Sequence, residues 1–527
     1  MNQVNKTKFI IPILLCLLLF VYIPLKLDFR RLFIADTLLK TIQAYSLKIS
    51  GYSDESLFYE AKNIDPTYKH FIMQQPFIGE VKGKVIGVFP LAYSIFLSPF
   101  AYKSILPYFP LLSYMLVIPY LFLLFRYWNF SPWHITFVLF CTFTLIPALD
   151  VSENSLFVLL NATGLTLWFL SKENKVLEFI AGFLIGFSVF FRLEPILFFP
   201  SIGLAVLLIY KQQGIRKSLF PGIGFLLPVI VFLLFNHIHY GHFLGPRFFF
   251  NYSDPEQRGG GTFMRIFEIL FLGKFSKPGF YVFTPLFLLV QLYYAIPGHF
   301  KELNKSEKIF FLGSLIFMLL ASFVAPNDGG NTGARYLTLA IFPLLLLSKN
   351  FVESLLDKER KIYHIWKSLA FACILFSLLA LYEHIHLHKR ITKQLNSTQE
   401  LFLDSKADIW ILSAQPLCDS VGIHFFSQPT LCIKDQKSFE EILPKLQKEY
   451  PSRNLAFYKF SDTFLDSIKA SESKLDTMNE LEKEYVRKIG GNSPEVRKMQ
   501  AFLKENFTNL KKNEKGTYSY ETYKLKE

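Results

Sequence analysis

A polar stretch between two apolar segments holds the residues best suited to chemistry. Residues 328–336 read DGGNTGARY, with FFLGSLIFMLLASFVAP shortly before them and LTLAIFPLLLL directly after them. Glycine lets a backbone approach a ligand closely, and arginine can hold a phosphate through two parallel hydrogen bonds. The stretch therefore predicts an anion-binding loop that contains Gly329, Gly330, Arg335 and Tyr336.

Carboxylates and a second arginine occur at similar breaks between apolar segments. Asp36 follows the first apolar run, Asp150 and Glu153 lie in PALDVSENSLF, and Arg192 and Glu194 lie in FFRLEP. A carboxylate can act as a general base towards a hydroxyl group or bind a divalent metal ion. Asp36, Asp150 and Glu153 are thus candidate catalytic residues, and candidate ligands if a metal ion is used. Arg192 is a second candidate phosphate ligand, with Glu194 beside it.

Five further polar groups are weaker candidates. They are Asp328 before the glycines, Asn236 and His237 in FNHIHYG, and Asp54 and Glu55 in a long polar loop. Many of the charged positions also have an ordinary structural explanation, such as a helix cap, a local ion pair or an arginine that reaches the membrane surface. What favours a site is their convergence on one side of a membrane, which the apolar segments predict.

The apolar segments are long enough to cross a membrane. The chain of 527 residues is 51% hydrophobic and 17% aromatic, and 19% of its residues are charged, whereas about 25% is usual for soluble domains. We expect an α-helical polytopic membrane protein of about 11–12 transmembrane helices. The expected spans lie near residues 9–26, 106–126, 133–149, 155–171, 176–191, 195–210, 218–237, 279–297, 308–325, 336–353 and 366–384.

Basic loops set the expected orientation. Residues 211–217, 301–308 and 358–367 are short and rich in lysine and arginine, and such loops stay in the cytoplasm. Counting from them, the breaks that carry the candidate residues face outward, as does the tail beyond residue 385. A cytoplasmic N-terminus then requires that the proline-containing segment 87–101 makes no full crossing. The basic loops and a lysine-rich tail also account for the net charge of +14 without a nucleic-acid partner.

Two domains are expected. Residues 1–390 form the transmembrane domain, with a first outer loop at 27–86, and residues 391–527 form a small extramembrane α/β domain. In the tail, ADIWILSA, IHFFSQ, TLCIK and NLAFYKF read as strands, SFEEILPKLQKEY reads as a helix, and a tyrosine-rich end reads as a possible strand. If the tail lies outside the cell, Cys418 and Cys432 can form a disulfide bond.

The order of the motifs resembles the C-type glycosyltransferase (GT-C) superfamily, which includes the protein mannosyltransferases and aminoarabinose transferases that use polyprenyl-phosphate-linked sugars. The matching elements, in order, are Asp36 with AYSLKISG, VFPLAYSIFLSPF, DVSENSLFVLL, AGFLIGFSVFFRLEP, NHIHYGHFLGP and DGGNTGARYL. The resemblance covers residues 8–390. The chain departs from it by lacking an Asp-Glu pair at the first acidic position, since Asp54 and Glu55 come later. This leaves open which of these acidic residues is the counterpart.

The resemblance implies a GT-C fold and an inverting displacement at the outer face. Asp36 would orient or deprotonate the acceptor, or share a metal ion with Asp150 or Glu153. The acceptor would attack the sugar C1, and Arg335 and Arg192 would hold the departing polyprenyl phosphate. Asn236 and His237 would contact acceptor or phosphate.

The implied activity is sugar transfer from a polyprenyl-phosphate donor, for a cell-envelope glycan, to a lipid, glycan or protein acceptor. The implied place is the inner membrane, with the site and the tail domain facing the periplasm. Two alternatives remain at this point. One is a transporter or flippase of lipid-linked glycans, and the other is a catalytically inactive scaffold with the same fold.

Overall fold

The protein forms two compact units, which we describe separately. The computed structural model describes residues 14, 17–18, 20–27, 35–252, 262–273, 277–325, 330–356, 361–472 and 494–525. The first unit, termed the helical unit, comprises Met1–Phe29, Pro90–Tyr93 and Tyr108–His388. The second, termed the sheet unit, comprises Arg30–Phe89, Ser94–Pro107 and Lys389–Glu527.

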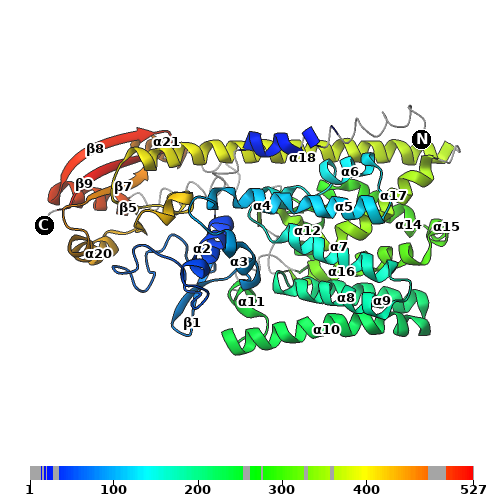
Figure 1. Ribbon diagram of the computed structural model, residues 1–527. Helices are drawn as coiled ribbons and strands as arrows, with labels where there is room; N and C mark the ends of the chain where they lie inside the picture. The colour runs from blue at the N-terminus through cyan, green and yellow to red at the C-terminus, as the bar shows by residue number, and fades with distance from the viewer. Residues whose placement is uncertain are drawn as a thin grey trace. The chain divides into compact units, whose positions relative to one another are not determined.

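The helical unit is built almost wholly from apolar helices (Figure 1). Their bounds are α4 (Phe109–Met115), α5 (Val117–Tyr127), α6 (Pro132–Phe140), η4 (Ile146–Leu149), α7 (Asn154–Leu170), α8 (Lys175–Phe187), η5 (Ser188–Phe190), α9 (Pro195–Tyr210), α10 (Gln212–Tyr240), α11 (Gly245–Tyr252), α12 (Thr262–Leu270), α13 (Phe280–Phe283), α14 (Pro285–Ala295), α15 (Pro297–Glu302), α16 (Lys305–Val324), η8 (Gly330–Ala340), α17 (Ile341–Leu356) and α18 (Lys361–Asp404). The residues of α18 after His388 belong to the sheet unit. Two strands of two residues each, β3 (Leu272–Gly273) and β4 (Lys277–Pro278), pair between α12 and α13.

Five helical segments among the described residues are long and apolar enough to cross a membrane. They are Leu106–Tyr127, Gln212–Tyr240, Lys305–Val324, Ala334–Leu356 and Tyr363–Asp404. Shorter apolar helices cover Leu91–Phe100, Asn154–Leu170, Pro195–Tyr210 and Pro285–Ala295. The chain is thus a helical membrane protein. The spans expected at 155–171 and 195–210 coincide with α7 and α9, whereas the span expected at 279–297 is divided between α13 and α14.

One expected span is broken. The segment predicted as a helix over 133–149 ends its α-helix at Phe140 and resumes only as the short 3₁₀ turn η4. The Thr142 hydroxyl group donates to Val138 O in the last helical turn and lies 2.8 Å from the Thr144 hydroxyl oxygen. Pro147 has no N–H group for a helical hydrogen bond. These residues end the helix early and leave a loop before α7.

Close packing of α8 against α10 depends on glycine. A Cβ atom on Gly182 would lie 1.8 Å from the carbonyl oxygen of Pro221, and one on Gly224 would lie 2.1 Å from that of Phe179. The two backbones therefore touch, as small residues permit between helices in membranes. Both helices run side by side in Figure 1. This packing fixes the loops at the ends of α8 and α10, which carry site residues.

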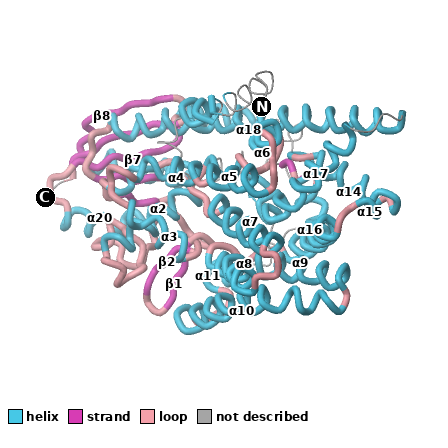
Figure 2. The backbone as a smooth tube through the Cα atoms, turned by 45° about the vertical axis from the view of Figure 1, so that its right-hand side comes forward, coloured by secondary structure: helices cyan, strands magenta, loops and turns pink. Residues whose placement is uncertain are grey.

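The sheet unit contains a mixed five-stranded sheet in the order β6-β5-β7-β9-β8, visible in magenta in Figure 2. Strand β5 pairs in parallel with β6 and with β7, whereas β9 pairs antiparallel with β7 and with β8. The tail elements are β5 (Ile409–Leu412), α19 (Gln415–Asp419), η9 (Gly422–Phe426), β6 (Thr430–Cys432), α20 (Gln436–Glu449), β7 (Asn454–Phe460), α21 (Asp462–Glu472), β8 (Thr508–Lys515) and β9 (Tyr518–Lys524).

The prediction of an α/β tail is confirmed, but one of the predicted strands is absent. The run IHFFSQ forms the 3₁₀ turn η9 rather than a strand, because Gly422 adopts a positive φ of 58° and starts a turn there. A disulfide bond links Cys418 to Cys432, with their Cα atoms 5.9 Å apart.

The first outer loop folds within the same compact unit as the tail. Its elements are α2 (Ala35–Ile49) and the hairpin of β1 (Ile78–Val81) and β2 (Lys84–Gly87). The short helices α3 (Leu91–Leu97) and η2 (Ser98–Phe100) follow it. The helical part of segment 87–101 spans only Leu91–Phe100, which is too short for the roughly 30 Å of a bilayer core.

Candidate active site

Four charged side chains, two of them buried and two partly buried, form a network in the helical unit. Arg192 Nη1 lies 3.2 Å from Glu153 Oε1, and Arg247 Nη1 lies 3.0 Å from the same oxygen. Arg192 also donates from Nε to Glu194 Oε1 at 2.9 Å and pairs with it through Nη2. We term Glu153, Arg192, Glu194 and Arg247 the arginine–glutamate network.

Because Glu153 and Arg192 are buried, each of these charges needs an oppositely charged partner. Glu153 is 1% exposed and Arg192 is 3% exposed. Burial lowers the pKa of the Arg192 guanidinium, but Glu194 and Glu153 raise it more, so the pKa is raised and the group stays charged. A charge so buried must be paired, because removal of its partner leaves it uncompensated in a medium of low polarity.

Local structure places each member at a helix end. Glu153 immediately precedes α7, and its carbonyl oxygen accepts the bond from Phe157 N that opens the helix. Arg192 follows η5, and Glu194 is the N-cap residue of α9 with Pro195 in the first turn. Proline favours the first helical position because it has no N–H group to leave unpaired. The motif FRLEP therefore ends one helix, starts the next and presents both charges at the break.

The aromatic ring of Tyr336 lies near two guanidinium groups. Arg192 Cζ is 5.9 Å and Arg335 Cζ is 5.4 Å from its centroid, both within reach of a cation–π contact. Arg335 is also near enough to Arg192 to repel it electrostatically. Both Arg335 and Tyr336 lie on η8, an unusually long 3₁₀ helix. The predicted neighbourhood of Arg192, Arg335 and Tyr336 thus exists around the network.

Arg247 is the network residue that sequence reasoning missed. It lies on α11, after a turn in which Gly241 and Gly245 both have φ of 76°. Only glycine adopts this conformation without strain, so the turn needs both residues. The motif NHIHYGHFLGP stops one residue before Arg247. The position of an arginine directly after the Gly-Pro pair was the feature of the sequence that could have indicated this residue.

Asn236 and His237 support this turn rather than reach into the network. The Asn236 side chain is 5% exposed, donates to Phe232 O in its own helix, and lies against Gly245. The His237 ring is exposed and stacks on Phe243 at 4.4 Å between centroids. Both residues therefore shape the α10–α11 connection that carries Arg247.

Asp150 lies at the start of the loop that ends in Glu153. Its Oδ1 atom accepts a hydrogen bond from Val151 N at 2.8 Å, and it interacts electrostatically with His388 on α18. Tyr93 interacts electrostatically with both Asp150 and Glu153, and its hydroxyl group lies 2.8 Å from Ser113 Oγ. Tyr93 and His388 are further neighbours that the sequence did not single out.

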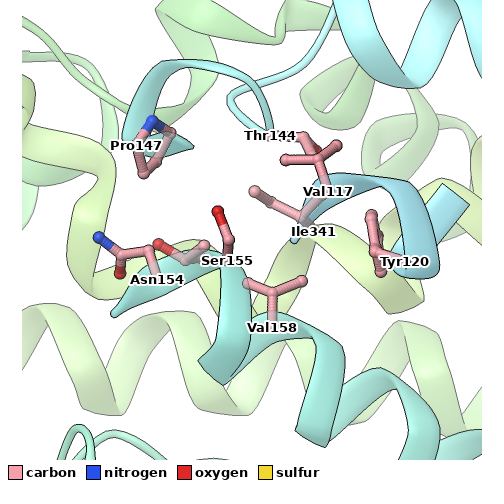
Figure 3. A pocket seen from close by; sticks show the side chains of 9 residues that line it. Val117, Tyr120, Thr144, Pro147, Asn154, Ser155, Val158 and Ile341 are labelled. Atoms are coloured by element: carbon pink, nitrogen blue, oxygen red, sulfur yellow. The ribbon is translucent and has the colours of Figure 1, made fainter. Parts of the chain in front are cut away.

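A small cavity adjoins the residues that follow Glu153 and Tyr336. Its lining comprises Val117, Tyr120, Thr144, Pro147, Asn154, Ser155, Val158, Thr338 and Ile341. In Figure 3 the Ser155 hydroxyl group faces the space that these side chains enclose. Most of the surface that these residues present to the cavity is apolar.

The remaining acidic candidates belong to the sheet unit. Asp36 is the second residue of α2, at the helix end where a negative charge is favoured. Asp54 forms an exposed ion pair with Lys84 at 2.9 Å and accepts a bond from Ser56 N. Burial raises the pKa of Asp54, but these partners lower it more, so its net pKa is lowered. Glu55 follows it in a half-buried loop position.

Two predicted residues, Asp328 and Gly329, lie outside the described residues, and Gly330 is the first residue of η8. A metal ion does not fit the arginine–glutamate network, because two guanidinium groups already contact Glu153 Oε1. Across the described ranges, no group of three His, Cys, Asp or Glu side chains is arranged to hold a metal ion. Asp36 lies in the sheet unit, whereas Asp150 and Glu153 lie in the helical unit, so a metal ion shared by Asp36 with either of them stays a prediction.

Comparison with known proteins identifies the fold. The chain superimposes on the crystal structure of ArnT from Cupriavidus metallidurans bound to undecaprenyl phosphate, with a TM-score of 0.54 over 97% of both chains. The chain has the GT-C fold. Sequence identity to ArnT is 10%, so the likeness is one of architecture. No family model and no curated protein sequence matches the chain.

Proposed function

We propose that the protein transfers a sugar from a polyprenyl-phosphate donor to an acceptor at the outer face of a membrane. The observation that carries this proposal is the convergence of Arg192, Arg247 and Arg335 on one side chain cluster with Glu153 and Glu194. Arginine matches the geometry of phosphate, so a group of three guanidinium side chains suits an anionic ligand.

The three arginines have different parts in this proposal. Arg192 is nearly fully buried and ion-paired with both glutamates, so it fixes the positions of the two carboxylates and does not bind the phosphate itself. Arg247 is 19% exposed and Arg335 is half-buried, so these two can reach a phosphate. Glu153 orients Arg247, which gives Glu153 a positioning role instead of the catalytic role expected from the sequence.

The proposed reaction is a single displacement at the anomeric carbon. An acceptor hydroxyl or amine attacks the sugar C1 and forms the new bond as the bond from C1 to the phosphate oxygen breaks. Polyprenyl phosphate leaves with the electron pair, and Arg247 and Arg335 stabilise its charge. Asp36, at the start of α2, accepts the acceptor's proton. One displacement inverts the anomeric configuration.

The fold supports the donor class, because the GT-C structure that the chain resembles was solved with undecaprenyl phosphate bound. The Cys418–Cys432 disulfide supports an outward-facing sheet unit, since disulfide bonds persist in oxidising compartments such as the periplasm. We accordingly place the protein in the inner membrane of a bacterium, acting in cell-envelope glycan assembly with a lipid, glycan or protein acceptor.

A transfer assay tests this proposal. Purified protein is incubated with radiolabelled polyprenyl-phosphate sugars and membrane acceptors, and wild type is compared with Asp36→Asn and Arg335→Ala. We expect release or transfer of sugar by wild type and a loss of about 100-fold or more in both folded variants. Absence of any sugar release by wild type across the donor panel would contradict the transferase proposal.

A further inference from the structure

The tail of the sheet unit holds the first outer loop through an aromatic contact. Phe425 and Phe426 of η9, which we term the aromatic wedge, are both 1% exposed. The Phe426 ring lies 5.1 Å from that of Tyr45 on α2, and the Phe425 ring lies 5.5 Å from that of Phe71 in the loop. Rings at these edge-on distances attract each other beyond the burial of their area.

Hydrogen bonds also join the tail to the first outer loop near the wedge. Cys432 N donates to His70 O at 2.8 Å, so the loop is hydrogen-bonded to the edge of β6 that faces away from β5. Gln415 Nε2 donates to Ile72 O at 3.0 Å, and Lys434 donates to Gln415 Oε1. The loop is therefore anchored to the tail by directional bonds as well as by apolar contact.

The disulfide bond brackets the wedge. Cys418 and Cys432 are 14 residues apart, and η9 lies between them. Both sulfur-bearing residues are buried, and Cys432 is also the residue that bonds to His70. Cross-linking the two ends restricts the conformations open to the intervening turn, which keeps Phe425 and Phe426 in place.

Helix α2 connects the wedge to Asp36. Tyr45, which contacts Phe426, lies nine residues after Asp36, or about 14 Å along a helix. The same end of α2 is fixed by Phe58 N, which donates to Ser46 Oγ at 2.7 Å. The end of α2 that carries Tyr45 and Ser46 is thus held by an aromatic contact and a hydrogen bond.

We propose that the C-terminal domain is a positioning element, which holds α2, and with it Asp36, in the orientation that transfer requires. Phe425, Phe426 and Tyr45 are the positioning residues, and the disulfide bond keeps the wedge formed. The catalytic half of this inference rests on the proposed function of Asp36. The structural half, that the wedge holds α2, stands without it.

Two readouts on the full-length protein in detergent test the inference. The variants are Phe426→Ala and the Phe425→Ala/Phe426→Ala pair, with Phe464→Ala as the matched control. Phe464 lies in the same domain and packs on Phe460 at 5.4 Å, within α21 and β7. Hydrogen exchange of the α2 amides reports the helix directly, and the kcat and KM for donor report the reaction.

We expect α2 amides to exchange at least about tenfold faster in the wedge variants and at the wild-type rate in the control. We expect kcat to fall about tenfold with KM for the donor within about twofold, and Phe426→Tyr to restore both readouts. Unchanged α2 exchange in the paired variant overturns the inference whatever the activity. Faster exchange with an unchanged kcat overturns the positioning role. A wild type without transferase activity contradicts the proposed function, while the exchange result still decides whether the wedge holds α2.

Discussion

Replacement of Glu153 by glutamine tests the arginine–glutamate network most sharply. The side chain is 1% exposed, and its Oε1 atom contacts Arg192 at 3.2 Å and Arg247 at 3.0 Å. Glutamine keeps the shape and one acceptor oxygen but removes the charge. Arg192 would then keep its ion pair with Glu194, whereas the ion pairs of Arg192 and Arg247 with Glu153 would be lost.

The expected cost follows from burial. Removing one partner of a buried ion pair costs about 3–5 kcal/mol, and the retained oxygen places Glu153→Gln near the lower end, at about 3 kcal/mol. Glu178→Gln is the matched control. Glu178 is 8% exposed and accepts a hydrogen bond from Ser171 Oγ at 3.3 Å, but it pairs with no cation among the described residues. Its loss should stay near or below about 1 kcal/mol.

The assay is reversible unfolding of the purified protein in mixed detergent, read as the change in the free energy of unfolding. Adding Arg247→Gln to Glu153→Gln should recover about 0.5–3 kcal/mol relative to the sum of the single changes, because the uncompensated charge is removed. The reasoning is refuted if Glu153→Gln costs no more than Glu178→Gln, or if the two changes in the network are strictly additive.

Three further predictions concern packing, the disulfide bond and pH. Gly182→Ala should destabilise the protein by about 1–3 kcal/mol because its Cβ would lie 1.8 Å from a backbone oxygen, whereas Gly203→Ala, with nothing within 4 Å, should be neutral or stabilising in the same unfolding assay. Replacing Cys418 and Cys432 by serine opens a loop of sequence separation 14 and should cost about 3 kcal/mol, measured by thermal denaturation with and without reductant; reductant should leave the variant unchanged. Burial lowers the pKa of His70 below its ordinary value of 6.5, so the folded chain binds that proton less readily than the unfolded chain. The contribution of His70 to the free energy of unfolding should therefore be full above pH 6.5 and be lost as the pH falls through the lowered pKa. Replacing His70 by asparagine should flatten this part of the plot of unfolding free energy against pH.

The sequence predicted the fold and part of the site because those features rest on short-range patterns. Apolar runs, basic loops and the order of the polar breaks carried the GT-C resemblance, and the likeness to the ArnT structure confirms that fold. The pairing of Arg192 with Glu194 was visible as FRLEP, since both residues lie within one turn. The Cys418–Cys432 disulfide was suggested by the location expected for the tail and is present.

The rest depended on contacts between distant segments. Arg247 lies 94 residues from Glu153, and nothing local to RFFF indicates that its partner is a buried glutamate. The run IHFFSQ has the composition of a strand, but its two phenylalanines face the first outer loop from a turn. In both cases the residue type was informative, whereas the partner was fixed only by the tertiary fold.

The most direct test of the central claim is binding of undecaprenyl phosphate to the purified full-length protein, compared among wild type, Arg247→Ala and Arg335→Ala. Arg453→Ala is the control, because Arg453 is 62% exposed and pairs with Asp408 on the sheet unit. A hydrogen bond to a charged group contributes about 1.5–3 kcal/mol, so each site variant should raise the Kd about 10–100-fold and the control should leave it unchanged. Equal Kd values for all four proteins, or no saturable binding by wild type, would show that Arg247 and Arg335 do not hold the phosphate of a polyprenyl donor.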